Sequence, residues 1–274
     1  MAFVSLPASS PVLGGPPPLY VFLPPSSPAL GGPPPIYVPL PSGSFSPLQL
    51  GATLKLWLRG DLGVTNVSGK ASAWADQSGN GNGASQGTAL FRPTITASSI
   101  NGKQCLTFDK ATGTIMTGAT SPVASGAART LIVVCRPVNT LGQIGGAVYD
   151  SRSAAPDYAQ WVMDLGGTDY YMTIPAGNIT GNVVIAGSTN YLIETYFDGA
   201  NFTVKNNHAA VTLSGSASGG NDSGTTGYSV GDRVSSPSTF AFNGDIGEII
   251  VCDTVLAGAN LTSTLSYILS YWAL

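Results

Sequence analysis

The sequence predicts an all-β fold, an antiparallel two-sheet sandwich closed by one C-terminal helix and preceded by an extended proline-rich arm. From residue 49 onward, short runs of β-branched and aromatic residues alternate with glycine and asparagine turns, as in sandwiches. Charged residues make up only 9% of the chain, against roughly 25% in an average soluble protein. A helical period occurs only at the C-terminus. We therefore divide the chain into an arm, residues 1–48, and one domain, residues 49–274.

The arm is a repeated, uncharged segment. Residues 1–47 hold 14 of the 20 prolines, and residues 9–24 return as residues 26–41 with 13 of 16 positions identical. Pro-Pro-Pro imposes an extended course and offers no amide donor, so the arm cannot fold alone. It is either a semi-rigid spacer or, as its apolar content favours, a segment that docks on partner subunits by strand addition or groove filling. The docking residues would be Leu13, Leu19, Tyr20, Val21, Phe22, Leu30, Ile36, Tyr37, Val38 and Leu40.

The domain contains ten predicted strands, each bounded by turn residues such as Asn-Gly and Asp-Gly. They are residues 53–58, 104–108, 130–136, 146–149, 160–164, 170–174, 191–197, 201–205, 228–230 and 247–252. Residues 202–213 read as a hairpin that turns at Asn206 and Asn207. The last element is a helix of about 13 residues, because Leu261, Leu265, Ile268, Leu269 and Trp272 form one apolar stripe at helical spacing.

Charge and cysteine content exclude several classes of partner. The net charge is −3 and the basic residues are scattered, so the footprint of nucleic-acid binding is missing. No apolar run approaches the roughly 20 residues of a membrane span, and the start lacks a basic leader region. Cys105, Cys135 and Cys252 each lie in an apolar run and read as small buried hydrophobes.

Two segments resemble a known family. Leu54-Lys-Leu-Trp-Leu-Arg-Gly-Asp-Leu-Gly-Val64, followed by Trp74-Ala-Asp-Gln-Ser-Gly-Asn-Gly-Asn-Gly-Ala-Ser-Gln86, resembles the opening of concanavalin A-like, laminin-G-like jelly-roll domains. Phe242-Asn-Gly-Asp-Ile-Gly-Glu-Ile-Ile-Val-Cys-Asp253 before a terminal helix is similar to their closing strand. Such domains occur in bacterial secreted proteins and bacteriophage virion proteins, as lectins, glycosidases, adhesins and capsid ornaments, so the resemblance implies the fold and leaves the function open.

The residues do not favour catalysis. Glycosidases of this fold carry Glu-x-Asp-x-Glu, whereas this chain has two glutamates, Glu194 and Glu248, and no such run. Asp245 and Glu248, three residues apart, should point to opposite faces of a strand. The single histidine, His208, is expected to be a solvated turn residue. We predict that the chain is not an enzyme.

Two binding sites are nevertheless worth testing. The family resemblance implies that calcium could bind through Asp76 and Asn80, although the segment lacks a dense acidic loop and we expect no other cofactor. A glycan could stack on aromatic residues beside hydrogen-bonding groups, with Tyr158, Trp161, Asp169 and Tyr170, and also Tyr171, as candidates. The alternative is that alternate members of this set fill the core.

The leading functional hypothesis is a bacteriophage virion structural protein. A capsid cement or decoration protein would dock its arm on the major capsid protein or other virion subunits, and would display its jelly roll on the capsid surface. Such a protein is made in the host cytoplasm and is expected to be a homo-oligomer, with no nucleic-acid or membrane partner. A tail or head fibre subunit is one alternative. A carbohydrate-binding, lectin-like module or adhesin for host-surface glycans is the other.

Overall fold

The computed structural model describes residues 45–124, 126–138, 146–150, 160–163, 169–174, 177–182, 187–210, 213–214, 227–232 and 241–274. The chain divides into two units, Met1–Ser44 and Phe45–Leu274. The ten predicted docking residues of the arm lie outside the described residues. The second unit begins at Phe45, so residues 45–48, which the sequence assigned to the arm, belong to the domain. No helix in the described part is long and apolar enough to cross a membrane.

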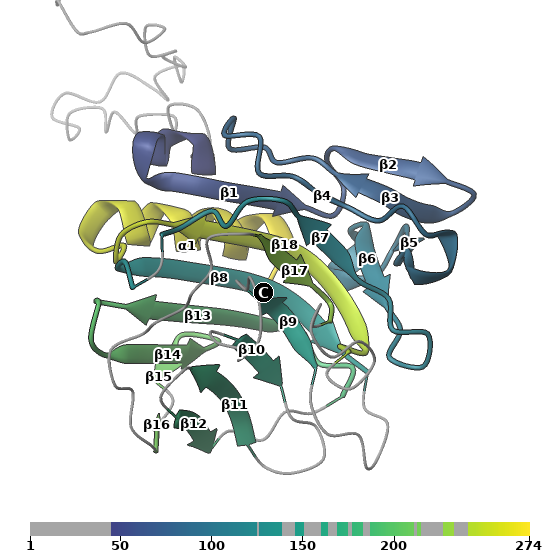
Figure 1. Cartoon of the computed structure of the whole chain (residues 1–274). Coiled ribbons are helices and arrows are strands. Elements are labelled where there is room, and N and C mark those ends of the chain that lie inside the picture. Colours follow the sequence, from purple (N-terminus) through teal and green to yellow (C-terminus); the bar gives the residue numbers. More distant parts are fainter. Residues whose placement is uncertain are drawn as a thin grey trace, which may run out of the picture. The chain divides into compact units, whose positions relative to one another are not determined.

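The first sheet is antiparallel and lies against the C-terminal helix (Figure 1). Its strands, in spatial order, are β1 (Leu54–Arg59), β18 (Gly244–Cys252), β8 (Arg129–Pro137), β13 (Tyr191–Phe197), β14 (Phe202–Asn206) and β15 (Ala209–Ala210). Strand β6 (Cys105–Phe108) pairs with the first residues of β18, and β5 (Thr94–Thr96) pairs with β6. These strands are rich in isoleucine, valine and leucine, which favour pleated, buried positions.

The second sheet is also antiparallel and is the more polar of the two. Its strands, in spatial order, are β2 (Val64–Val67), β3 (Lys70–Trp74), β4 (Ala84–Ser85), β7 (Met116–Gly118), β17 (Tyr228–Val230), β9 (Ala147–Asp150), β10 (Gln160–Met163), β11 (Asp169–Ile174), β12 (Gly177–Asn182) and β16 (Leu213–Ser214). A single pairing of β3 with β5 connects it to the first sheet. Three short 3-10 helices, η1 (Pro47–Thr53), η2 (Ala89–Phe91) and η3 (Ile100–Gly102), lie outside the strands. The predicted all-β sandwich is therefore confirmed.

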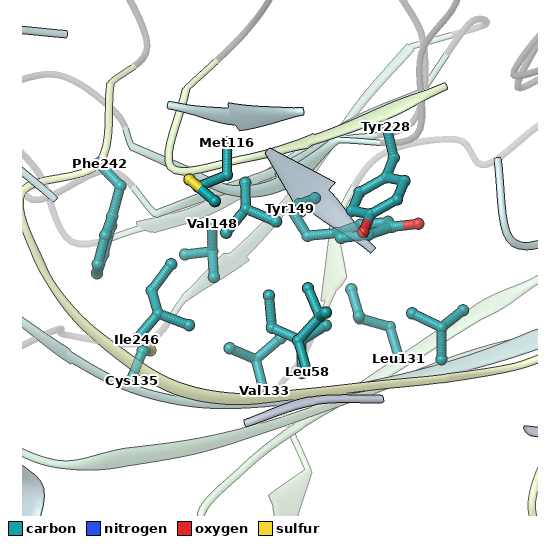
Figure 2. Close-up of a cluster of buried hydrophobic side chains, with 14 of the residues drawn as sticks. Leu58, Met116, Leu131, Val133, Cys135, Val148, Tyr149, Tyr228, Phe242 and Ile246 are labelled. Carbon is teal, nitrogen blue, oxygen red and sulfur yellow. The ribbon is translucent and has the colours of Figure 1, made fainter. Parts of the chain in front are cut away.

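Two hydrophobic layers hold the domain together. The first fills the space between the sheets, and Figure 2 shows Leu131, Val133 and Ile246 of the first sheet below Met116 and Tyr228 of the second. The second layer lies between the first sheet and helix α1 (Gly258–Trp272), with Trp57, Ile250, Ile268 and Trp272 among its buried members. All five residues of the predicted apolar stripe belong to this layer. The helix is 15 residues long and packs as the sequence predicts.

A β-bulge in β18 corrects one prediction about side-chain direction. The pairing with β8 shifts between Ile246 and Glu248, so Gly247 is the extra residue. Asp245 pairs with Arg136 and Glu248 with Val134, and these two β8 positions share a face because they are two residues apart. Asp245 and Glu248 consequently lie on the same face of the sheet, that of α1, and the prediction of opposite faces was wrong.

All ten predicted strands are present, each within three residues at either end of its expected bounds. The hairpin is also confirmed, but it turns one residue later than predicted, at Asn207 and His208. Both have positive φ, 47° and 66°, as a tight hairpin turn requires. The three cysteines are buried, as predicted, and form no disulfide. Burial raises the pKa of the Cys105 thiol to about 11, which makes it an unreactive thiol at neutral pH.

Candidate functional site

The predicted glycan-binding residues fall on the second sheet. Tyr158 lies outside the described residues. For Trp161, Asp169 and Tyr170 the structure describes the backbone of the strands and not the side chains. What the structure establishes is their register: Trp161 pairs with Tyr149 and Met172, and Tyr170 pairs with Met163.

This register separates the candidates onto two faces. Directly paired residues share a face, and residues alternate along a strand. Tyr149 is buried in the layer between the sheets and stacks on Tyr228, with ring centroids 5.5 Å apart. Positions 161 and 170 therefore lie on this inner face, which we call the core face. Positions 169 and 171 lie on the opposite face, which we call the outer face.

A row of mostly polar residues, joined strand to strand by direct pairing, crosses the outer face. Successive pairings join its nine members, Thr65, Ala73, Ser85, Thr117, Ser229, Asp150, Gln160, Thr173 and Asn178. Thr65 and Ser85 are exposed and Thr117 is half-buried, whereas Ser229 and Asp150 are buried. Ser229 Oγ donates a 2.7 Å hydrogen bond to the carbonyl of Asp232. Short hydroxyl and amide side chains on strands are suited to hydrogen-bonding a polar ligand. Sequence reasoning missed this row, because its members come from nine different strands.

The residues of the expected calcium site form a turn held by direct hydrogen bonds. Asp76 accepts bonds from the backbone amides of Trp57, Ser78 and Asn82 at 2.9–3.0 Å and from Ser78 Oγ at 2.7 Å. The Asn80 amide nitrogen donates to the carbonyl of Leu54 at 2.8 Å. Calcium needs six to eight oxygen ligands. Here the Asp76 carboxylate already accepts hydrogen bonds from protein groups, and the Leu54 carbonyl accepts one from the Asn80 amide. This arrangement does not fit a calcium ion. In the described part of the chain, no group of three His, Cys, Asp or Glu residues could hold a metal.

Glu248 is the centre of a buried polar network beneath α1. Its carboxylate accepts hydrogen bonds from Trp57 Nε1 at 2.6 Å, Trp272 Nε1 at 2.5 Å and the Tyr267 hydroxyl at 2.9 Å. Burial raises the pKa of Glu248 to about 7, although the three donors and Arg59 act in the opposite direction. The network joins the sheet to the helix and is closed to solvent, since Glu248 is 1% exposed.

Asp245 is equally enclosed. It forms a 2.8 Å ion pair with Arg136 and accepts a 2.6 Å hydrogen bond from Ser99 Oγ. Although Asp245 and Glu248 share a face, both are buried and their oxygens are occupied by protein groups. Glycoside hydrolysis needs two carboxyl groups open to the scissile bond, and these two do not meet that requirement.

His208 is an exposed turn residue, as expected, but it also contacts a buried acid. Its Nδ1 lies 2.9 Å from Oε1 of Glu194, a fully buried carboxylate on β13. The Tyr196 hydroxyl donates to the other oxygen of Glu194, and Lys205 Nζ lies over the Tyr196 ring. The hairpin turn therefore places a histidine against a buried acid, a contact that sequence spacing does not reveal. Because Glu194 is enclosed, we interpret the cluster of His208, Glu194 and Tyr196 as one that stabilises the β13–β14 hairpin.

Comparison with solved structures finds this fold in proteins of very different sequence. The binding domain of Paraclostridial Mosquitocidal Protein 1 has a TM-score of 0.57 and 12% identity, over 82% of this chain and 53% of that one. Trypanosoma rangeli sialidase, in complex with 2-keto-3-deoxy-D-glycero-D-galacto-2,3-difluoro-nononic acid, has a TM-score of 0.52 and 10% identity, over 89% of this chain and 36% of that one. The chain thus spans about half the length of the first and about a third of the second.

These likenesses show the fold, which is consistent with the expected concanavalin A-like sandwich. No protein-family model and no curated protein matches the sequence. Neither structural neighbour described above is a virion protein. The resemblance to virion domains therefore stays a prediction from the sequence.

Proposed function

We propose that residues 45–274 form a non-catalytic carbohydrate-binding module. The observation that carries this proposal is the register of β9 to β12, which gathers polar positions and the aromatic position 171 on one face of the second sheet. Sugars are recognised by aromatic rings together with hydroxyl, amide and carboxylate groups, and the outer face combines these residue types. The fold is also that of a toxin's binding domain and of part of a sialidase bound to a sugar analogue.

The register sharpens the choice of residues. Asp169 and Tyr171 occupy the outer face, so they are the best candidates for direct glycan contact. Positions 161 and 170 belong to the core face, and Trp161 pairs directly with the buried Tyr149. We therefore favour the core-filling alternative for these two residues.

A glycan-array screen of the full chain, followed by titration calorimetry, tests the proposal. Tyr171→Ala and Asp169→Asn should each weaken binding about tenfold or more, since stacking and charged hydrogen bonds contribute on this scale. Ser266→Ala on the exposed side of α1 is the control and should bind normally. If the folded chain binds no glycan on the array, the proposed function is wrong.

The repeated arm favours a second proposal, that residues 1–44 fasten the domain to a larger assembly. Two near-identical uncharged repeats suit two equivalent sites on a lattice of subunits, and a virion with the major capsid protein or a fibre as partner is such an assembly. The two proposals are compatible, because a displayed domain can bind host-surface glycans. Limited proteolysis of the isolated protein and of its native assembly tests the second. Cleavage within residues 1–44 in both samples would refute docking by the arm.

A further inference from the structure

The η2 loop carries the most exposed apolar pair of the described domain. Leu90 is 58% exposed and Phe91 is 38% exposed, and Phe91 is the one aromatic side chain in the described residues that is classed as exposed. The loop adjoins the second sheet, because the amide of Ile115, one residue before β7, donates to the carbonyl of Phe91 at 2.9 Å. An exposed ring beside the outer face is a surface that a sugar ring could stack on.

Two cations hold the same loop. Arg92 donates from Nε to the carbonyl of Gln86 at 2.8 Å and from Nη2 to the carbonyl of Gly87 at 2.7 Å. Lys70 Nζ lies 3.5 Å from the carbonyl of Ala89. Lys70 lies on β3 and pairs with Thr94 of β5, two residues after Arg92. These contacts orient both cations and leave further N–H groups on each, since guanidinium has five and ammonium three.

Neither cation is paired with a carboxylate of the described residues. Elsewhere in the described domain, Lys55, Arg59 and Arg136 form ion pairs with aspartates. Lys70 and Arg92 form none with the described residues, and no Asp or Glu occurs between residues 77 and 108. The net charge of −3 comes from residues scattered between Lys55 and Asp253, and salt screens charges beyond about 8 Å. Neither cation is therefore neutralised by an ion pair with a described carboxylate.

We propose that the η2 loop is a subsite for a carboxylate-bearing sugar residue of an acidic glycan. Arg92 pairs with the sugar carboxylate through its remaining N–H groups. Lys70 adds a second positive charge, and Phe91 stacks on the apolar face of the sugar ring. Ser85 and Thr117, on the outer-face row, continue the binding surface toward the second sheet. This inference rests on the proposed carbohydrate-binding function and names the ligand class.

Titration of the full chain with matched ligands tests the inference. The acidic probes are α2,3-sialyllactose and an oligogalacturonate, and the neutral probes are lactose and the methyl ester of the same oligogalacturonate. The affinity for at least one acidic probe should exceed that for its neutral counterpart by about tenfold or more, because a hydrogen bond to a charged group changes affinity on this scale. This preference should shrink as salt is raised from 50 to 500 mM, because added salt screens exposed charges.

The variants separate charge recognition from loop structure. Arg92→Gln and Lys70→Gln should each abolish most of the preference, whereas Arg92→Lys keeps the charge and should lose only part of it. Lys55→Gln removes one positive charge that is already paired with Asp253 and should leave binding unchanged. Melting temperatures of all four variants check that the loop still folds. Lys70→Gln is decisive here, because its contact with the loop is long and its loss should not alter stability.

Three results are distinguishable. Acidic preference that is lost in Arg92→Gln and Lys70→Gln but kept in Lys55→Gln supports the subsite. Binding of neutral and acidic probes with equal affinity, or a preference that the two loop variants leave intact, overturns the subsite while the carbohydrate-binding function stands. No binding of these probes or of any glycan on the array refutes the proposed function itself.

Discussion

Replacing Glu248 by glutamine should remove a pH dependence of stability that is built into the contact between the first sheet and α1. Burial holds the pKa of Glu248 at about 7, against 4.5 for the unperturbed group. Between these values the unfolded chain releases the proton and the folded chain keeps it. The unfolded state therefore binds fewer protons, and the free energy of unfolding falls as pH rises.

The size of the effect follows from the difference in pKa. At 1.36 kcal/mol per pH unit, the free energy of unfolding should fall by about 3 kcal/mol between pH 4.5 and 7, and should be flat with respect to this group outside that window. Glutamine does not titrate and keeps the shape of the side chain. Glu248→Gln should therefore lack this decrease.

Urea unfolding of the wild type and Glu248→Gln at pH 4.5, 5.5, 6.5 and 7.5 measures the difference. Subtracting the two series cancels all other titrating groups. Carbon-13 labelling of glutamate provides a second measurement, because the chain contains only Glu194 and Glu248. If the two urea series run parallel within about 1 kcal/mol, or the signal lost in Glu248→Gln titrates near pH 4.5, the reasoning about this buried carboxyl is wrong.

Two further predictions concern the fold. Gly247→Ala should destabilise the domain by about 1–3 kcal/mol, because a Cβ at Gly247 would lie 2.7 Å from the Trp272 ring. Gly87→Ala is the matched control, because nothing lies within 4 Å of a Cβ there. Equal urea midpoints for the two variants would contradict the argument. Asp76→Ala should cost roughly 2–4 kcal/mol by leaving several donors unpaired, and a chelator should leave the wild-type melting temperature unchanged; a chelator-induced drop of several degrees that calcium reverses would instead establish a calcium site.

The sequence predicted the elements of the first sheet and α1 well because their apolar periods are strong. Tyr191–Phe197 was placed to the residue, and the stripe from Leu261 to Trp272 packs as expected. It missed β2, β3 and β12, and the last two of these contain few β-branched or aromatic residues. It also missed the short strands β4, β5 and β7, because two or three residues carry no period. They become strands only through cross-strand pairing, which tertiary structure supplies.

The candidate sites were harder to predict for the same reason. The direction of Glu248 depends on one extra residue in β18, and a bulge leaves no distinct pattern in a continuous apolar run. Likewise, choosing between Tyr170 and Tyr171 requires the ladder that joins β10 to Tyr149. The resemblance placed a calcium site at Asp76. Only the structure shows that three backbone amides already donate hydrogen bonds to this carboxylate.

The layering of the domain explains why binding should concentrate on the second sheet. Helix α1 covers one face of the first sheet and buries its most apolar residues there, including Ile250 and Trp272. The other face of that sheet meets the second sheet across the inner core (Figure 2). The central strands of the first sheet, β18 and β8, are therefore covered on both faces. The outer face of the second sheet is exposed at Thr65 and Ser85 and buried at Ser229 and Asp150, and it carries short polar residues where the core face carries apolar ones. The proposed glycan surface therefore lies on the one sheet face that belongs to neither apolar layer.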